Sequence, residues 1–215
     1  MKVCVVGSGG REHALAHVLA RTAEVIVTPG NPGIPFSTNQ PVKEIEADLF
    51  VIGPEQPLVE GLADELRKQG KLVFGPNADG AKIEGSKSWM KEILVESGVP
   101  TARHGVFTEK EAAFDFLQNL SDFYVIKTDG LAAGKGVLVT SDLAEARQAV
   151  SEYLSGKAFG TAGKRIVIEE GLTGPEISLL AVCDGQTAVP LAPAQDFKRL
   201  RDQDKGPNTG GMGAY

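Results

Sequence analysis

The stretch VIKTDGLAAGKGVLVT, residues 125–140, decides the fold, because two short apolar runs flank a loop rich in glycine. A Walker A loop would need the spacing G-x-x-x-x-G-K-[ST] and a helix after it. Here three residues separate Gly130 from Gly134, Gly136 follows Lys135 directly, and the next segment is a predicted strand. The loop therefore joins two strands, and its backbone N–H groups can fold over phosphates, as the glycine-rich loop of kinases does.

Lys127 ends the strand before this loop, where its ammonium group can meet the same phosphates as a point charge. A plain surface hairpin is the alternative interpretation. Ala132 and Ala133 argue against it, because loops that face solvent seldom carry small apolar residues.

Composition narrows the class of protein. The chain has 215 residues and a formal net charge of −6, which argues against nucleic acid or an anionic membrane as the main partner but leaves room for a local phosphate pocket. The two cysteines, Cys4 and Cys183, stand inside apolar runs and are expected to be buried thiols. The apolar run at the N-terminus is too short for a signal peptide or a membrane span, so we expect a cytoplasmic protein.

Short apolar runs alternate with helical patterns in the first hundred residues. Alternation of this kind predicts an α/β domain with a parallel sheet. The expected strands are residues 2–6, 24–28, 48–53 and 71–75, and the expected helices are 11–22, 59–70 and 85–98. No good helix is predicted between Thr28 and Ala47, so the connection between the second and third strands is expected to be shortened.

The pattern changes near Pro100 to an α+β module with a largely antiparallel sheet. Its expected strands are residues 123–127, 136–140 and 164–170 and two runs within 176–192 that turn at Asp184-Gly185, and its helices are 109–120 and 141–154. Ser141 and Asp142 are good N-cap candidates for the second helix. The last twenty residues are polar and rich in glycine, and are expected to form a loop that needs something to order it.

The segment GSGGREH, residues 7–13, follows the first strand and opens the first helix, a position that favours anions. It departs from the dinucleotide fingerprint because Glu12 stands where a third glycine is needed, and the second strand ends without an acidic residue for a ribose. A phosphate of a smaller ligand, assisted by Arg11, is the favoured interpretation. A tight turn without a ligand is the alternative.

Two further patterns are weaker. The stretch VIEEGLTGPE, residues 167–176, can present the backbone edge of a strand to an adenine, and Glu176 can bind ribose hydroxyls. Solvent-exposed charged residues explain this pattern equally well. His13 and His17 have a zinc-compatible spacing on one helix, but the glutamate of H-E-x-x-H and a third ligand are missing. No metal site is therefore assigned to the chain.

Taken together, the motifs of this chain resemble the glycinamide ribonucleotide synthetase family, also called phosphoribosylamine–glycine ligases. The resemblance covers all 215 residues and rests on the order of these stretches: GSGGREHALA, TPGNPG, VIGPEQPLVEGLAD, FGPNADGAKIEGSK, PTA, VIKTDGLAAGKGV, AFGTAGKRIVIEE, QDFKR and DKGPNTGGMGAY. It implies an ATP-grasp enzyme of de novo purine synthesis. ATP phosphorylates the carboxylate of glycine, and the amine of 5-phosphoribosylamine attacks the glycyl phosphate to give the amide, ADP and phosphate.

The resemblance also implies roles for individual residues. Phosphate contacts and catalysis fall to Lys127, Arg199 and Asn208. The ATP-binding set comprises these three with Lys91, Gly130, Gly134, Lys135, Gly136, Glu169, Glu170, Leu172 and Glu176, and residues 130–136 form a lid loop. The side that binds phosphoribosylamine and glycine comprises Gly9, Gly10, Arg11, Glu12, Asn31, Glu55, Asp196, Gly210 and Gly211.

The resemblance further implies a Rossmann-like domain over residues 1–100, a connecting segment over 101–120, an ATP-grasp lid over 121–190 and the start of a central subdomain over 191–215. The family continues well past Tyr215, so the ligands for Mg²⁺ or Mn²⁺ are expected beyond this point and residues 1–215 alone are expected to be inactive. A monomer or dimer that binds only small molecules is expected. A non-catalytic nucleotide-binding module and another ATP-grasp carboxylate–amine ligase remain the alternatives.

Overall fold

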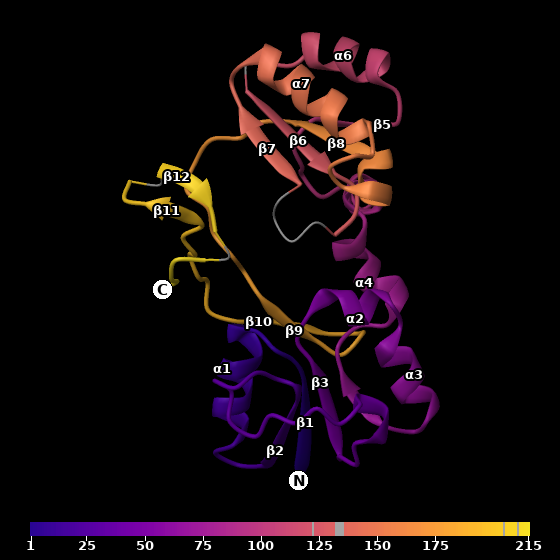
Figure 1. Cartoon of the computed structure of the whole chain (residues 1–215), viewed down its shortest axis with the longest axis vertical. Helices are drawn as coiled ribbons and strands as arrows, with labels where there is room; N and C mark the ends of the chain where they lie inside the picture. Colours follow the sequence, from indigo (N-terminus) through magenta and orange to yellow (C-terminus); the bar gives the residue numbers. More distant parts are fainter. Residues whose placement is uncertain (122, 132–135, 204, 210) are drawn as a thin grey trace. The chain divides into compact units, whose positions relative to one another are not determined.

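The computed structural model describes residues 1–121, 123–131, 136–203, 205–209 and 211–215. The chain forms two compact units (Figure 1). The first consists of Met1–Thr101 with Asp129–Leu131, and the second of Ala102–Thr128 with Ala132–Tyr215. No described helix has the length and apolar character needed to cross a membrane.

The first unit is built on the predicted parallel sheet, with strand order β2-β1-β3-β4. Its strands are β1 (Lys2–Gly7), β2 (Glu24–Pro29), β3 (Leu49–Ile52) and β4 (Leu72–Phe74). Its helices are α1 (Gly10–Leu19), α2 (Glu55–Val59), α3 (Leu62–Lys68), α4 (Ala78–Gly85) and α5 (Lys87–Glu96). The sequence predicted neither α4 nor α2, which shares only Val59 with the helix predicted at 59–70. That predicted helix corresponds to α3, which begins after Gly61, whose φ of 90° interrupts the helical backbone.

Apolar side chains cover both faces of this sheet, as a parallel sheet requires. On one face Val3, Val5 and Val27 pack against Ala16 of α1. On the other face Cys4, Phe50 and the helices α2 to α4 form a second core, to which Ile45 contributes. The inner strand β1 therefore contributes side chains to both cores and is buried on both of its faces.

The connection between β2 and β3 has no described α-helix, as predicted, and contains only the 3₁₀ turn η1 (Val42–Glu44) among its described elements. Ile45 is 1% exposed and fills the core directly. Lys71 holds this segment, because its Nζ donates a hydrogen bond to the carbonyl oxygen of Ile45 at 3.1 Å and lies 5.0 Å from the ring centroid of Phe50. These contacts cover part of the sheet face where a crossover helix would otherwise pack.

The second unit contains an antiparallel sheet of strand order β5-β8-β6-β7. Its strands are β5 (His104–Phe107), β6 (Tyr124–Thr128), β7 (Val137–Thr140) and β8 (Ile166–Glu170), and its helices are α6 (Lys110–Gln118), α7 (Leu143–Leu154) and the 3₁₀ turn η2 (Gly160–Lys164). Asp142 caps α7 as predicted, accepting a hydrogen bond from the N–H of Ala144 at 2.7 Å. Both long helices pack on one face of the sheet (Figure 1), where Ile126, Ile166 and Ile168 are fully buried.

Two hairpins complete the second unit. They pair β9 (Ala181–Cys183) with β10 (Ala188–Pro190) and β11 (Arg199–Arg201) with β12 (Lys205–Asn208). The prediction that Cys183 is buried is wrong, because no described residue covers its two-stranded hairpin and the thiol is exposed. The prediction that the last twenty residues form only a loop is also wrong, because β11 and β12 satisfy each other's backbone groups.

Candidate substrate and nucleotide sites

The first candidate site lies at the carboxyl ends of β1 and β3, where parallel α/β sheets bind ligands. Glu12 is 4% exposed, and one of its carboxylate oxygens accepts a hydrogen bond from the N–H of Gly9 at 2.6 Å. A Cβ atom on Gly7 would lie 2.5 Å from Cγ of Glu12, and one on Gly53 would lie 2.0 Å from its Oε1. Only glycine at both positions leaves room for this buried carboxylate.

Arg11 connects the start of α1 to the start of α2. Its Nη1 donates to the carbonyl oxygen of Gly53 at 2.9 Å and to Oε1 of Glu55 at 2.9 Å. Desolvation opposes ionisation of Glu55, but hydrogen bonds from its own backbone N–H and from Arg11, with the charge of Arg11, hold its pKa below the usual range. The Arg11 side chain is 59% exposed, so its remaining donors can reach a ligand.

Asn31 fixes the loop after β2 against this site. Its Nδ2 donates to the carbonyl oxygen of Ser8 at 2.7 Å, and its Oδ1 accepts from the N–H of Gly33 at 2.7 Å. The structure thus brings together six residues that the sequence assigned to the substrate side: Gly9, Gly10, Arg11, Glu12, Asn31 and Glu55. Backbone donors at the start of α1 and one guanidinium group suit an anionic ligand.

Asp129 forms a second polar cluster in the first unit. Its carboxylate accepts from the N–H of Ser88 at 2.7 Å, from the hydroxyl of Ser88 at 2.9 Å and from the hydroxyl of Ser86 at 3.1 Å. Nζ of Lys87 donates to the carbonyl oxygen of Gly130 at 3.0 Å. These contacts fasten residues 129–130 to the first turn of α5, at the start of the glycine-rich loop.

Lys91, which the sequence assigned to phosphate, also lies on α5 in the first unit. It is 4% exposed, and its Nζ donates to the hydroxyl of Thr101 at 2.6 Å. Its role at a nucleotide therefore stays a prediction.

The second unit carries the next candidate site on the sheet face that α6 and α7 leave uncovered. Nζ of Lys127 lies 2.9 Å from Oε1 of Glu169. Register explains the contact, because Lys127 pairs with Val167 and Glu169 with Val125, so the two charged residues are diagonal neighbours on one face. Antiparallel pairing also places His104 beside Glu169 on this face.

Two more residues assigned to the nucleotide, Glu170 and Leu172, lie at the end of β8 and just after it. Oε1 of Glu170 accepts from the N–H of Arg103 at 2.8 Å, whereas Leu172 is 70% exposed. The carbonyl oxygen of Gly136 accepts from the N–H of Thr128 at 2.9 Å, which closes the base of the loop. Gly134, Lys135 and Gly210 lie outside the described residues, as does the side chain of Asn208.

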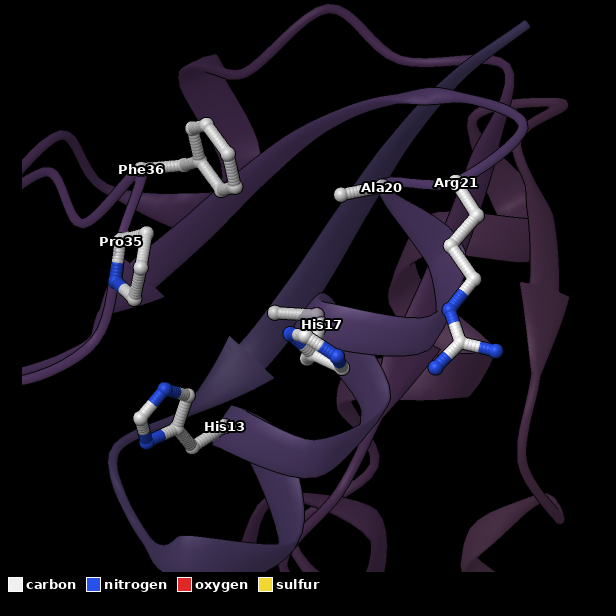
Figure 2. A pocket seen from close by; sticks show the side chains of 7 residues that line it. His13, His17, Ala20, Arg21, Pro35 and Phe36 are labelled. Atoms are coloured by element: carbon white, nitrogen blue, oxygen red, sulfur yellow. The ribbon is translucent and has the colours of Figure 1, made fainter.

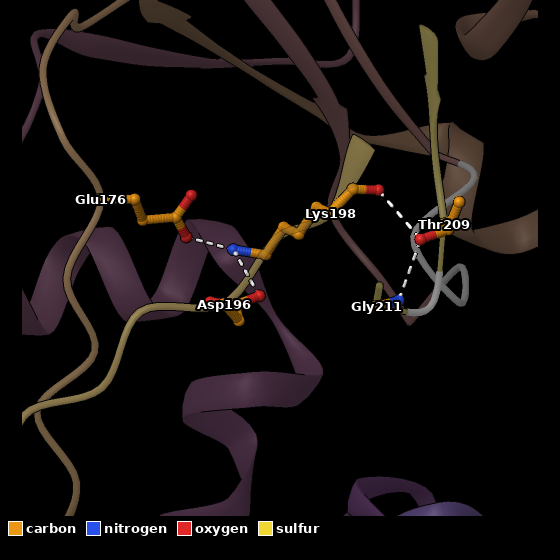
Figure 3. Close-up of polar contacts among 5 residues, drawn as sticks. All are labelled: Glu176, Asp196, Lys198, Thr209 and Gly211. Carbon is orange, nitrogen blue, oxygen red and sulfur yellow. Dashed lines mark hydrogen bonds and ion pairs between the residues drawn. The ribbon is translucent and has the colours of Figure 1, made fainter. Parts of the chain in front are cut away.

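A lysine joins two of the predicted site carboxylates (Figure 3). Nζ of Lys198 forms an ion pair with Glu176 and lies 3.4 Å from Oδ2 of Asp196. The hydrogen bond to Glu176 raises the pKa of Lys198 above its usual range, helped by the charges of both carboxylates and opposed by desolvation. Thr209 supports the arrangement, since its hydroxyl donates to the carbonyl oxygen of Lys198 at 3.0 Å and accepts from the N–H of Gly211 at 3.0 Å.

Arg199 follows this lysine on β11. Its Nη1 donates to the carbonyl oxygen of Gly206 at 2.8 Å. Arg199 also lines a cavity of about 580 Å³ together with Phe197, Leu200, Arg201, Asp202, Gln203 and Met212. Two guanidinium groups on one cavity favour an anionic ligand there.

Two family models match the chain from end to end. The N domain of phosphoribosylglycinamide synthetase matches residues 1–84, and its ATP-grasp (A) domain matches residues 85–215. The chain belongs to the phosphoribosylglycinamide synthetase family. This finding confirms the family that the motifs indicated and the fold class of a Rossmann-like domain followed by an ATP-grasp lid.

Individual members of the phosphoribosylglycinamide synthetase family agree with this assignment. The chain is 49% identical over 233 aligned residues to phosphoribosylamine–glycine ligase of Xylella fastidiosa (strain 9a5c), covering 100% of this chain and 53% of that relative. The crystal structure of phosphoribosylamine–glycine ligase from Thermotoga maritima is similar with a TM-score of 0.85 at 37% identity, covering 100% of this chain and 55% of that one. The chain thus spans about half the length of the family members it matches.

The fold extends beyond this family. D-alanyl-alanine synthetase A from Vibrio cholerae is similar with a TM-score of 0.69 at 13% identity, covering 91% of this chain and 66% of that one. At this identity the likeness concerns the fold alone.

The roles of four residues in these sites were not predicted from the sequence. Gly7 and Gly53 make room for Glu12, Asp129 fastens the loop base, and Lys198 joins the two carboxylates. The glycine after the third strand was a usable signal, because glycines at strand ends often admit a neighbouring side chain. Lys198 offered no such signal, since a lysine in a polar segment is most often solvated.

Proposed function

We propose that this chain is the substrate- and nucleotide-binding part of a phosphoribosylamine–glycine ligase. The observation that carries the proposal is the match of both family models, in order, along residues 1–215. Relatives that bear this name are 46–49% identical across all of this chain. The reaction would join glycine to 5-phosphoribosylamine and convert ATP to ADP and phosphate.

The chemistry requires two transfers. A carboxylate oxygen of glycine attacks the γ-phosphorus of ATP, the new O–P bond forms, and ADP leaves with the electron pair of the broken bond. The amine nitrogen of phosphoribosylamine then attacks the carbonyl carbon, phosphate leaves, and the nitrogen loses a proton. Phosphorylation is needed because a free carboxylate is a poor acyl donor, and the charge that develops on the phosphate must be held by fixed cations and donors.

On this proposal Lys127 meets the phosphates of ATP. Its pairing with Glu169 supports the role, because the carboxylate holds the ammonium group in one place on the sheet face opposite α6 and α7. Glu170 and Leu172 would border the adenine, and Glu176 would hold ribose hydroxyls after exchanging its contact with Lys198. Arg199 and Asn208 would contact the phosphates, and residues 130–136 would close over them.

Arg11 and the backbone donors at the start of α1 would hold the phosphate of phosphoribosylamine. Glu12, Asn31 and Glu55 would fix this surface, and Asp196 with residues 210–211 would face the substrates. Magnesium is the metal expected with ATP, but the described residues contain no cluster of three His, Cys, Asp or Glu side chains that fits a cation. No step is therefore assigned to a metal held by this chain.

Nucleotide binding gives the first test. Titration calorimetry of residues 1–215 with ATP should show saturable binding, and Lys127→Ala should weaken it about 10- to 150-fold, the equivalent of one lost charge-assisted contact of about 1.5–3 kcal/mol. Lys110→Ala removes an exposed lysine on α6 and serves as the matched control. Equal affinities in the two variants would contradict the role of Lys127.

Turnover gives the second test. Phosphate release is measured with ATP, magnesium, glycine and phosphoribosylamine formed in the assay. Residues 1–215 should be silent, and an extended protein with the full length of its relatives should turn over. Turnover by residues 1–215 would refute the expected inactivity, and a preference of the extended protein for another carboxylic acid over glycine would favour a different ATP-grasp ligase.

A further inference from the structure

A cavity of about 270 Å³ lies beside the outer face of α1 in the first unit (Figure 2). Figure 2 shows His13, His17 and Arg21 following one another along α1 and just past its end, with Pro35 and Phe36 on the loop across from them. Ala16 and Ala20 complete the lining. No residue of the Arg11–Glu55 cluster takes part, so the cavity is separate from the proposed substrate site.

The polar side chains that line this cavity are two imidazoles and one guanidinium group, which present nitrogen atoms to a ligand. Among the described residues, the side chains of His13, His17 and Arg21 form no hydrogen bond or ion pair, and all three are exposed. No carboxylate lines the cavity. In a chain of net charge −6, this local set of donors favours an anion over a cation.

Phe36 forms an aromatic wall of the cavity, and its backbone adopts an unfavourable conformation there. Its φ is +66°, a left-handed conformation that is uncommon for a bulky residue. The backbone is held there by a hydrogen bond from the N–H of Val27 to the carbonyl oxygen of Phe36 at 3.0 Å. The ring is nevertheless 55% exposed, so burial in the core does not explain why an aromatic residue occupies this position.

We propose that this cavity binds a small planar anion, namely an aromatic or heteroaromatic ring that carries a phosphate or carboxylate group. The ring would pack on Phe36 and Pro35, and the anionic group would meet Arg21 and the imidazoles. A volume of about 270 Å³ suits one ring system with one charged group rather than a larger cofactor. The proposal does not depend on the ligase reaction, because none of the residues assigned to that reaction lines the cavity.

Phenyl phosphate is the first probe, and its binding to residues 1–215 is measured by ligand-observed NMR titration. Arg21→Gln removes the guanidinium group and Phe36→Asn removes the ring, while asparagine tolerates the left-handed backbone. Each variant should weaken binding about tenfold, the loss expected for one charge-assisted contact or one aromatic wall. Lys68→Gln, an exposed change elsewhere in the same unit, should leave it unchanged.

Two further probes show which chemical group of the ligand the cavity recognises. Benzyl alcohol has the ring without the charge and should bind about tenfold more weakly than phenyl phosphate. Benzoate compared with phenyl phosphate shows whether a carboxylate or a phosphate is preferred, and either preference supports the proposal. Unsaturable binding of both anions would overturn the proposal. Affinities of Arg21→Gln and Phe36→Asn that equal the affinity of the unchanged protein, or binding of Zn²⁺ alone, would also overturn it. ATP binding measured on the same samples separates failure here from failure of the proposed ligase function.

Discussion

Replacing Asp129 by alanine tests how firmly the loop base is fastened to α5. The carboxylate accepts hydrogen bonds from the N–H of Ser88, from its hydroxyl and from the hydroxyl of Ser86. The Ser86 hydroxyl in turn accepts from the N–H of Trp89 at 3.2 Å, which makes it the N-cap of α5. Asp129 therefore acts both as an anion at a helix N-terminus and as the group that orients the cap.

The magnitude follows from these contacts. Loss of an effective cap costs about 1 kcal/mol. Loss of an anion beside a helix N-terminus costs about 0.3–1 kcal/mol. Ser88 is 3% exposed, and its N–H and hydroxyl would lose the carboxylate, with only the Ser86 hydroxyl left at 3.1 Å from the Ser88 hydroxyl, which adds roughly 1 kcal/mol. The sum is about 2–3 kcal/mol, and an m-value of about 2 kcal/mol per molar urea converts it to a midpoint lowered by roughly 1–1.5 M.

The assay is urea unfolding followed by tryptophan fluorescence. Trp89 is the single tryptophan of the chain and lies in the first turns of α5, so it reports the unit that the substitution affects. Glu46→Ala removes an exposed carboxylate of the same unit and should leave the midpoint unchanged. A midpoint for Asp129→Ala that matches Glu46→Ala would refute the proposed fastening.

Four further outcomes are expected. Burial, partly offset by the charges of two nearby lysines, raises the pKa of Cys4 to about 11, so iodoacetamide at pH 8 should modify the exposed Cys183 and spare Cys4 in mass spectra until urea unfolds the chain. Because this pKa is raised in the folded state, the contribution of Cys4 to stability is complete below the unfolded pKa and is lost as pH rises toward 11, which pH-dependent urea unfolding can measure. Thr128→Val should raise the free energy of unfolding by about 1 kcal/mol, since the buried hydroxyl has no described hydrogen-bond partner; a lower value in chemical unfolding would contradict this. Gly53→Ala should lower the melting temperature, because a Cβ atom would lie 2.0 Å from a carboxylate oxygen of Glu12 and overpacking costs about 1–3 kcal/mol; an unchanged melting curve would show that the carboxylate can move aside.

Local patterns were enough to predict most of the sheet framework. The buried runs around Cys4 and Phe50 read as strands because both faces of a parallel sheet are apolar. The strand β5 was missed, because HGVF has no clear alternation and is held by pairing with β8. The hairpin of β11 and β12 was missed for a related reason, since its residues are polar and only their partner strand satisfies the backbone.

The site residues show a similar division between local and long-range information. A glycine-rich turn between a strand and a helix was enough to predict an anion site at the start of α1, and that site stays a prediction. The pairing of Lys127 with Glu169 could not be predicted, because it depends on a register that places β8 directly beside β6. A shift of one residue would move one of the two side chains to the face covered by α6 and α7.

The ion pair between Lys198 and Glu176 bears on whether Glu176 can bind a ligand. If Glu176 receives ribose hydroxyls, the carboxylate must exchange an ion pair for neutral donors, and Lys198 keeps Asp196 as its remaining partner. Both side chains of the Lys198–Glu176 pair are about half exposed, so water screens the attraction and the exchange costs little. The same pair in a dry cavity would oppose nucleotide binding strongly. The exposure of this cluster, rather than its charges alone, is therefore what makes Glu176 compatible with a ligand-binding role.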